Sequence, residues 1–280
     1  MNSPPLPQMH RPTSAPGIVA RVLVGVENTP ASLEAVRQAR ILAGPHGWVS
    51  AVAVADIAAA AQAGAAAVHA AAQIRADAAR ARERAVSAGA PNVAKVVTGR
   101  PRETLLAQLA ATGATLLALG AEPHRRATGL LLGAVGSSML RHSPCSVLLS
   151  RPGRTGSWPQ RIVTGVDASP QSLEAAAIAA DLARTHDAEL IVITALGGKT
   201  VHVDLVRELH PHVRVDPRSP VDALVYEGRA ADLLVIGSRG RHGLGNLGSV
   251  SERVAHRATT SVLVIRAGSG YQSHRSAGAR

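Results

Sequence analysis

The sequence predicts an α/β protein made of two tandem doubly wound domains, each with a five-stranded parallel sheet flanked by helices. Short apolar segments of strand length alternate with longer helical segments, and this alternation occurs twice along the 280 residues. Apolar residues make up 46% of the chain, yet Phe is absent and only two Trp and two Tyr occur, so the cores must consist of Ala, Val, Leu and Ile. Strands that are apolar throughout are typical of parallel sheets covered by helices on both faces.

An internal repeat indicates where the two domains lie. Residues 21–43, RVLVGVENTPASLEAVRQARILA, match residues 161–183, RIVTGVDASPQSLEAAAIAADLA, without a gap. Residues 133–151, GAVGSSMLRHSPCSVLLSR, match residues 248–266, GSVSERVAHRATTSVLVIR, in the same way. We therefore expect one domain at 20–151 and a second at 161–267, joined by a linker at 152–160. The second copy is shorter, mostly where the first carries the Ala-rich segment 61–90.

Each copy is expected to contain five strands. In the first copy they lie near 20–26, 48–54, 92–97, 115–119 and 145–149, and helices begin near Pro30, Ala61, Arg102 and Ala134. In the second copy the strands lie near 161–167, 188–195, 212–215, 232–236 and 261–266. Ser169 followed by Pro170 is typical of a helix N-cap and the first residue of the helix.

The ends of the chain are expected to be unstructured. Residues 1–19 are rich in proline and lack the apolar stretch of a signal peptide, which predicts a disordered arm, and residues 268–280 predict a flexible tail. No apolar run approaches the roughly 20 residues that a membrane helix needs. The single cysteine, Cys145, lies in an apolar segment and is expected in the core. A reducing, cytoplasmic location follows as the simpler expectation.

The net charge of +11 raises the question of a nucleic-acid partner. Nearly all of the excess is Arg, because Lys95 and Lys199 are the only lysines. The sequence has no aromatic ladder for single strands and no recognition helix, which argues against nucleic-acid binding. A surface of this charge would still attract polyanionic small ligands.

The glycine-rich segment 237–254, GSRGRHGLGNLGSVSERV, joins the fourth strand of the second copy to a helix. In doubly wound sheets, ligands bind at the carboxyl ends of the strands. Gly237 permits backbone conformations closed to other residues and lets a ligand approach the main chain. Gly248, Ser249 and Ser251 stand at the helix start, where free N–H groups and the helix dipole favour an anion. The segment suits a di- or triphosphate, and a plain connecting loop is the alternative.

Asp167 ends the first strand of the second copy. First and fourth strands are neighbours in one common doubly wound order, so its carboxylate would face the same crevice and accept hydrogen bonds from a ribose hydroxyl or an adenine amino group. The alternative is that Asp167 caps the following helix, a role it can share with Ser169.

Three segments together, GVDASPQSLEAA, ADLLVIGSRG and GSVSERVAHRATTSVLVIR, resemble the universal stress protein family, and the two copies carry this resemblance over residues 20–267. The resemblance implies a five-stranded sheet of order 3-2-1-4-5 in each copy. It also implies an adenine-nucleotide site with the pattern Gly-x-x-Gly, nine residues, then Gly-Ser or Gly-Thr. Pairing through the fifth strands, here SVLLS and SVLVI, is implied as well, either between the two domains or in a homodimer.

The resemblance implies a nucleotide site in the second copy. Asp167 would lie at the adenine or ribose end, Ala195 would offer its backbone to adenine, Gly237, Arg239 and Gly240 would line the ribose and phosphates, and Gly248, Ser249, Val250 and Ser251 would hold the phosphates. The pattern has one departure, because only the seven residues RHGLGNL separate Gly240 from Gly248. The loop must therefore close over a shorter span of chain.

The first copy departs further from the family pattern. Glu27 stands where the second copy has Asp167, Pro123 replaces the second glycine, and Ala134 replaces the hydroxyl residue. Pro123 lacks an N–H group and Ala134 cannot donate to a phosphate. We interpret the first site as degenerate, with weak anion binding left open by Ser137, Ser138, Arg125 and Arg126.

Metal and catalytic constellations are weak. His202, His210 and His212 straddle Pro211 without helical spacing and are interpreted as a surface cluster. No phosphate-loop lysine and no obvious Mg²⁺-binding pair of carboxylates stand out, so we do not expect an enzyme.

The leading hypothesis is a stress-response or regulatory protein that binds ATP or a related adenine nucleotide in its second domain, with Mg²⁺ as a companion ion. It would act by ligand occupancy, with a regulatory protein as an expected partner. The alternative is a nucleotide-free protein-interaction module of the same fold, and a slow ATPase is less favoured.

Overall fold

The computed structural model describes residues 17–89, 92–121, 124–126, 129–152, 157–197, 203–209, 212–238 and 248–266. The strands of the first half are β1 (Arg21–Val26), β2 (Trp48–Ala55), β3 (Val93–Thr98), β4 (Leu116–Gly120) and β7 (Ser146–Ser150), with a short pair β5 (His124–Arg126) and β6 (Gly129–Leu131). Its helices are α1 (Pro30–Ala43), α2 (Ala67–Ser87), α3 (Pro101–Thr112) and α4 (Ala134–His142), with 3-10 helices η1 (Gly17–Val19) and η2 (Ile57–Ala66).

The second half repeats this order in a shorter form. Its strands are β8 (Arg161–Gly165), β9 (Glu189–Ala195), β10 (Arg214–Asp216), β11 (Leu233–Gly237) and β12 (Ser261–Ile265). Its helices are α5 (Pro170–His186), α6 (Val203–Leu209), α7 (Pro220–Gly228) and α8 (Ser249–Arg257). Every strand expected from the sequence is present, with small shifts at the ends, and the α/β class is confirmed.

Three details differ from the sequence expectations. The α-helix expected from Ala61 begins only at Ala67, and the residues before it form the 3-10 helix η2. Gly64, within η2, has a positive φ of 56°, which breaks the regular helical backbone just before α2. The β5–β6 hairpin was not predicted. The disordered arm was expected to reach residue 19, but Gly17–Val19 forms η1 and the side chains of Ile18 and Val19 are buried. Residues 1–16 and the expected tail at 268–280 lie outside the described residues.

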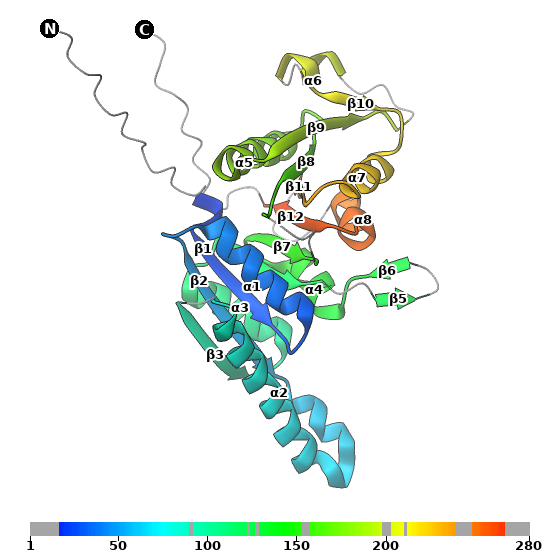
Figure 1. The fold of residues 1–280 in the computed structure, drawn as a ribbon. Helices are drawn as coiled ribbons and strands as arrows, with labels where there is room; N and C mark the ends of the chain where they lie inside the picture. The colour runs from blue at the N-terminus through cyan, green and yellow to red at the C-terminus, as the bar shows by residue number, and fades with distance from the viewer. Residues whose placement is uncertain are drawn as a thin grey trace, which may run out of the picture.

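All the long strands belong to one sheet of ten strands (Figure 1), in the order β10-β9-β8-β11-β12-β7-β4-β1-β2-β3. Neighbours within each half are parallel, as in the β1–β4 and β8–β11 pairs. At the centre, β12 pairs with β7 in the antiparallel direction, with Leu263 opposite Leu148. The two fifth strands therefore join the halves within one chain, and a homodimer through these strands would require this pairing to open.

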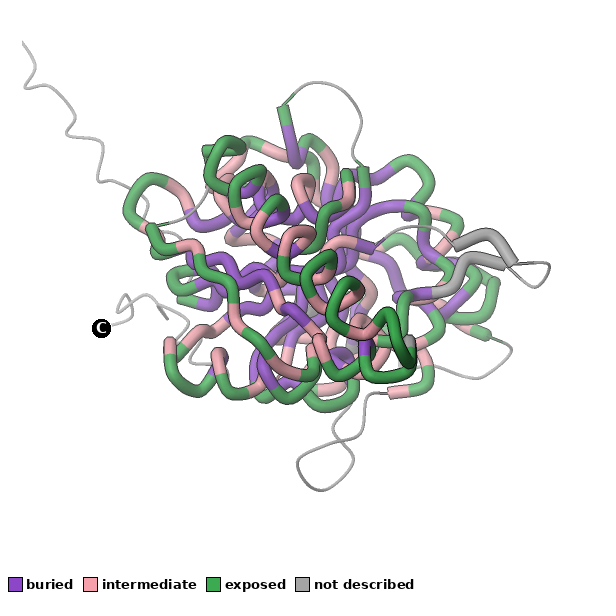
Figure 2. The backbone as a smooth tube through the Cα atoms, turned by 90° about the horizontal axis from the view of Figure 1, so that it is seen from below, coloured by how far each residue is buried: buried purple, intermediate pink, exposed green. Residues whose placement is uncertain are grey.

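Helices cover both faces of the sheet. Residues of α1, α2 and α5 pack on one face, and residues of α3, α4, α7 and α8 pack on the other. The burial pattern follows these layers, with the central strands buried and the edge strands β3 and β10 and the outer faces of the helices more exposed (Figure 2). The first part of α2 and the preceding η2 extend away from the sheet (Figure 1). Among the described helices, none has the length and apolar content to cross a membrane.

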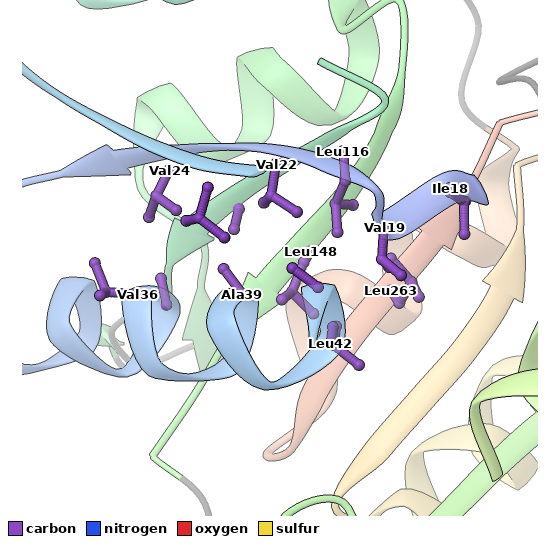
Figure 3. Packing of buried hydrophobic residues seen from close by; sticks show 14 of the residues in the cluster. Ile18, Val19, Val22, Val24, Val36, Ala39, Leu42, Leu116, Leu148 and Leu263 are labelled. Atoms are coloured by element: carbon purple, nitrogen blue, oxygen red, sulfur yellow. The ribbon is translucent and has the colours of Figure 1, made fainter. Parts of the chain in front are cut away.

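The core under α1 shows how an alanine- and valine-rich sequence packs without phenylalanine. Val36, Ala39 and Leu42 of α1 point toward the sheet at helical spacing (Figure 3). They meet side chains that alternate along the strands, such as Val22 and Val24 of β1. Small alanines let the helix approach the sheet closely, and the larger aliphatic side chains fill the remaining space.

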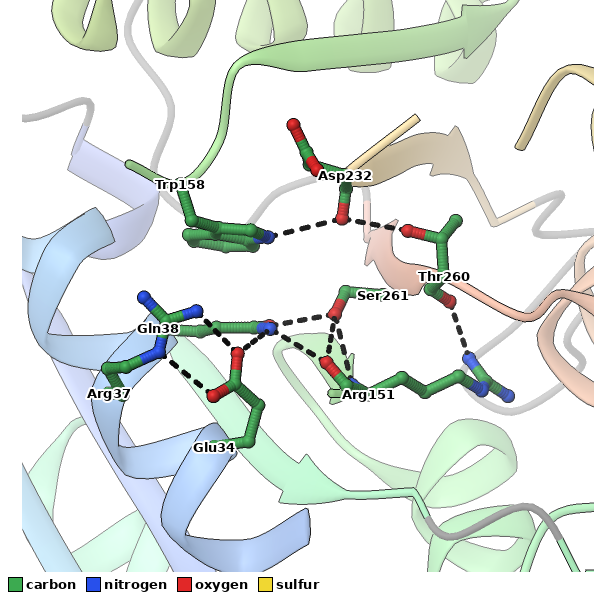
Figure 4. A network of polar contacts seen from close by, with 8 residues as sticks. All are labelled: Glu34, Arg37, Gln38, Arg151, Trp158, Asp232, Thr260 and Ser261. Atoms are coloured by element: carbon green, nitrogen blue, oxygen red, sulfur yellow. Dashed lines mark hydrogen bonds and ion pairs between the residues drawn. The ribbon is translucent and has the colours of Figure 1, made fainter. Parts of the chain in front are cut away.

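A polar network crosses between the halves at the end of the central strands (Figure 4). The Gln38 amide nitrogen donates to the Arg151 carbonyl at 3.0 Å, and the Ser261 hydroxyl donates to Gln38 Oε1 at 2.9 Å. Nearby, Trp158 Nε1 and the Thr260 hydroxyl both donate to the Asp232 carbonyl, at 3.2 and 2.8 Å. These buried groups satisfy each other, so the interface between the halves combines an apolar sheet with paired polar side chains.

Candidate functional site

The carboxyl ends of β8 and β11 form the centre of the candidate site in the second half. These strands are parallel neighbours, with Val235 opposite Thr164. Helix α5 begins a few residues after β8, and α8 begins at Ser249 after the connection that follows β11. Because both strands end at the same edge of the sheet, the first turns of both helices lie at that edge.

Asp167 is exposed and participates in the start of α5. Its Oδ1 accepts hydrogen bonds from the backbone N–H of Ser169 at 3.1 Å and from the Ser169 hydroxyl at 2.6 Å. Ser169 is the N-cap residue, and its hydroxyl oxygen accepts from the Ser172 N–H at 3.3 Å. The expected cap at Ser169 is confirmed, and Asp167 shares the capping role by holding the Ser169 side chain.

Gly237 is required by packing. A Cβ atom at this position would lie 2.5 Å from the backbone oxygen of Gln171 in the first turn of α5. The expected reason, a backbone conformation closed to other residues, is not the one found, since Gly237 is not among the described glycines with positive φ. The first half has the same arrangement, because a Cβ at Gly120 would lie 2.5 Å from Ser32 N. This glycine is therefore a feature of the fold in both halves.

The start of α8 has the geometry of an anion site. Its N-cap is Gly248, and among the described residues no side chain caps the helix. The first intrahelical bond runs from the Glu252 N–H to the Gly248 carbonyl at 3.0 Å. The N–H groups of Ser249, Val250 and Ser251 therefore precede the helical ladder and point out of the helix start. Ser249 is exposed, whereas Val250 is half-buried and packs on the core.

Ser251 holds the helix start against the strand. Its side chain is buried, and its hydroxyl donates to the Gly237 carbonyl at 2.8 Å. The family resemblance implies that Ser251 helps to hold the phosphates, whereas in the structure its hydroxyl donates to the strand. Ser251 thus places the N–H groups of α8 beside the end of β11.

The remaining predicted residues fall at the edge of this site or beyond the described chain. Ala195 ends β9, the strand next to β8, and lies opposite Asp216 of β10. Arg239 and Gly240 lie outside the described residues, as does the seven-residue loop after Gly240. The structure thus gathers Asp167, Gly237 and the first turn of α8 at one edge, with Ala195 one strand away.

A charged cluster at the end of β10 was not predicted from the sequence. Asp216 is buried and accepts from the Arg218 N–H and from Arg218 Nη1, both at 2.8 Å. The Arg218 guanidinium lies 3.8 Å from the centre of the Tyr226 ring. A signal was present, since VDPRSP at 215–220 places an aspartate before a Ser-Pro helix start, as VDASP does at 166–170. No group of His, Cys, Asp and Glu suited to a metal ion occurs in the described parts of the chain.

The corresponding edge of the first half is built differently. Gly133 caps α4 without a side-chain bond, but Gly136 stands where α8 has Ser251, so the hydroxyl link to the strand is missing. The residue after Glu27, Asn28, accepts a hydrogen bond at 2.7 Å from Arg84 of α2. Helix α2 stands where the second half has the shorter helix α6. The Arg84 side chain of α2 therefore reaches the end of β1, at the position where the second half has Asp167 and Ala168.

These features define a doubly wound α/β protein whose two halves each carry a glycine-capped helix at the carboxyl edge of the sheet. The sequence profile of the Universal stress protein family matches residues 19–151, 159–201 and 195–266. Because these matches include most of the sequence and fall in both halves, the chain belongs to this family as a tandem member.

Individual relatives agree with this assignment. A universal stress protein of Mycobacterium tuberculosis is 33% identical over an alignment of 183 residues, and the match covers 55% of this chain and 62% of that protein. A universal stress protein of Mycolicibacterium smegmatis is 30% identical over an alignment of 166 residues, and the match covers 49% of this chain and 56% of that protein. The chain thus matches less than two thirds of the length of these relatives.

The fold is shared with solved members of the family. The crystal structure of a universal stress protein from Archaeoglobus fulgidus has a TM-score of 0.65 and is 19% identical. The likeness covers 89% of this chain and 99% of that one. At this level of identity the likeness establishes the fold alone.

Proposed function

We propose that this universal stress protein binds ATP or a related adenine nucleotide at the carboxyl edge of its second half, and that it acts through ligand occupancy. The observation that carries the proposal is the glycine-capped start of α8. No side chain in the described part of the chain caps its first turn, and Ser251 fixes this turn beside the end of β11. Asp167 lies at the end of the neighbouring strand, so phosphate and nucleoside groups would be recognised at one edge.

The helix start supplies the phosphate end of the proposed site. Backbone N–H groups at a helix N-terminus attract anions, and the helix dipole adds to this preference. Ser249 is exposed and can add a hydroxyl donor. Mg²⁺ would enter as an ion carried by the phosphate oxygens, since it keeps several of its waters in such sites.

The nucleoside end would be recognised by Asp167 and Ala195. An ionised carboxylate offers about four acceptor positions, so Asp167 can bond a ribose or adenine group while it also accepts from Ser169. Ala195 is at the end of β9 and would contribute its backbone. This division predicts that Asp167 affects nucleosides and nucleotides alike, whereas the start of α8 affects only phosphorylated ligands.

We favour nucleotide binding without hydrolysis because of where the two lysines lie. Lys95 is on β3, at the edge of the sheet in the first half, and Lys199, the other lysine of the chain, lies outside the described residues. Phosphoryl transfer relies on positioned cations around the leaving phosphate. Cytoplasmic location, a regulatory partner and self-association stay predictions from the sequence.

Calorimetric titration of the full chain with ATP tests the proposal. Ser249→Pro removes one N–H and one hydroxyl at the first residue of α8, where proline fits a helix. The preceding Gly248 has φ −65° and ψ 145°, which suits a residue before proline. Ala134→Pro makes the matched change at α4. We expect Ser249→Pro to weaken ATP binding about tenfold or more, the scale of a hydrogen bond to a charged group, and Ala134→Pro to leave it unchanged.

A second pair of variants addresses the nucleoside end. Asp167→Asn retains an oxygen that can accept from Ser169, so α5 keeps its cap, and Glu27→Gln is the matched control in the first half. We expect Asp167→Asn to lower the affinity for adenosine and the affinity for ATP to a similar extent. If the wild-type chain binds no ATP at millimolar concentration, the nucleotide proposal fails and the interaction-module alternative takes its place. Phosphate release that disappears in Ser249→Pro would instead favour the ATPase alternative.

A further inference from the structure

Helix α8 is held at its carboxyl end by the other half of the molecule. Arg151 follows β7 of the first half, and its side chain is buried. Its Nη2 donates to the Ala255 carbonyl at 2.6 Å and its Nη1 donates to the Thr260 carbonyl at 2.9 Å. These carbonyls lie in the last turn of α8 and just before β12, where a cation interacts favourably with the negative end of the helix dipole.

The amino-terminal turn of α8 also contacts the first half. Glu252 lies in this turn, and Arg141 of α4 forms an ion pair with it, with Nε donating to Oε1 at 2.9 Å. A carboxylate in the first turn of a helix repels an anion that binds at the same helix start. The Arg141 guanidinium offsets this charge, and it comes from the half in which the nucleotide pattern is degenerate.

The duplicated fold provides an internal comparison. Arg266 is the counterpart of Arg151, and its Nη2 donates at 2.5 Å to the Leu140 carbonyl of α4. The Arg141–Glu252 pair has no such counterpart, because Ser137 stands in the place of Glu252 and His256 in the place of Arg141. The charge compensation at a helix start therefore belongs to α8, the helix with the candidate site.

We propose that Arg141 and Arg151 are positioning residues for the nucleotide site of the second half, so that the first half supports this site across the interface. The inference rests on the nucleotide function proposed above. Arg151 of the first half holds the carboxyl end of α8, and Ser251 holds its amino end against β11 of the second half. Arg141 of the first half neutralises the Glu252 carboxylate in the first turn of α8. The first half thus has a physical role in binding even though its own site is degenerate.

The charge of the ligand separates this role from a purely structural one. In the full chain, Arg141→Met leaves the Glu252 carboxylate uncompensated, and we expect ATP affinity to fall about two- to fivefold, the scale of an exposed ion pair. The loss should decrease from ATP through ADP to AMP and vanish for adenosine. Arg141→Lys should retain most of the affinity, and adding Glu252→Gln to Arg141→Met should restore it. Equal losses for ATP and adenosine, or an unchanged ATP affinity, would overturn the role of Arg141.

Arg151 is tested against its own counterpart. Arg151→Met and Arg266→Met each remove a guanidinium that crosses the interface, and we expect only the first to lower ATP affinity. Circular dichroism and thermal unfolding show whether each variant is folded, and Arg151→Lys, which cannot bridge two carbonyls in the same way, replaces Arg151→Met if that variant does not fold. Equal ATP affinity in the Arg151 and Arg266 variants would contradict the role of Arg151. A wild-type chain that binds no nucleotide would instead contradict the proposed function itself.

Discussion

Arg151 and Arg266 occupy equivalent places directly after the two fifth strands, and each reaches into the opposite half. The backbone N–H of Arg151 donates to the Ser261 hydroxyl at 3.0 Å, and that of Arg266 donates to the Ser146 hydroxyl at 3.0 Å. Ser261 and Ser146 are themselves equivalent in the repeat. Burial lowers the pKa of Arg151 to about 10, so this side chain is still charged at neutral pH. The repeat is therefore also a structural symmetry, in which each half completes polar contacts of the other.

Thr164 gives the first testable prediction. It is fully buried on β8, and its hydroxyl has no hydrogen-bond partner among the described residues. The first half has Val24 at the equivalent place, also buried. We expect Thr164→Val to raise the free energy of unfolding by about 1 kcal/mol, because the desolvation cost of the hydroxyl disappears. Urea denaturation measures the change, and Val24→Thr is the matched control with the opposite sign. A destabilised Thr164→Val variant would contradict this account.

Gly237 gives a prediction about packing. A Cβ at this position would meet the backbone of Gln171 at 2.5 Å, and backbone atoms cannot move aside cheaply. We expect Gly237→Ala to destabilise the fold by about 1–3 kcal/mol, the usual cost of overpacking. At Gly165, a Cβ would meet the end of the Leu224 side chain at 3.1 Å, which can shift. Gly165→Ala should therefore cost less in thermal or urea unfolding, and equal costs would argue against backbone contact as the reason for Gly237.

The Gln38–Ser261 hydrogen bond predicts coupling between the halves. Both side chains are buried, and the equivalent of Gln38 in the second half is the apolar Ile178. We expect Gln38→Met and Ser261→Ala each to destabilise the chain, with a coupling energy of about 0.5–3 kcal/mol in a double-mutant cycle. Urea unfolding of the four proteins provides the cycle. Additive losses would show that the two side chains do not stabilise each other.

The partial burial of His256 at the interface leads us to predict that the free energy of unfolding depends on pH. Its Nδ1 accepts a hydrogen bond from the Leu132 N–H at 3.3 Å, which requires the neutral ring. Burial lowers the pKa of His256 from 6.5, with Arg141 and Arg151 acting in the same direction and Glu252 opposing them. The unfolded chain therefore binds more protons near pH 6, so stability is lost as the pH falls below 6.5 toward the folded pKa.

The test of His256 compares the wild-type chain with His256→Gln, whose amide oxygen can still accept from Leu132. We expect the wild-type free energy of unfolding to fall more between pH 7.5 and pH 5 than that of the variant. Burial also lowers the pKa of His186, but this residue is common to both proteins and its contribution cancels. Identical pH profiles would contradict the assignment to His256.

Much of the fold could be predicted because its signals are local and occur twice. The apolar strands, the Ser-Pro start of α5 and the burial of Cys145 follow from short segments, and the structure agrees on each. The η1 segment could not be predicted, because the burial of Ile18 and Val19 depends on partners far along the chain. The β5–β6 hairpin could not be predicted from the repeat, because residues 121–132 differ in length and sequence from their counterpart, residues 238–247.

The candidate site was predicted in part. Residue types at strand ends indicated Asp167, Gly237 and the start of α8, and the structure places all three at one edge. Their individual roles depend on contacts that no spacing reveals. Position 237 must be glycine because the backbone of Gln171 approaches it closely. The role of Ser251 follows from its hydrogen bond to the Gly237 carbonyl, and that of Arg141 from an ion pair across the interface between the halves.

Hydrogen–deuterium exchange of the full chain with and without ATP shows where on the protein the nucleotide binds. With ATP bound in the second half, we expect slower exchange at the start of α8, residues 248–252, and between β8 and α5, residues 166–172, with no change at the start of α4, residues 133–137. ATP at saturating concentration that leaves α8 unprotected, or that protects α4 equally, would contradict this proposed binding site.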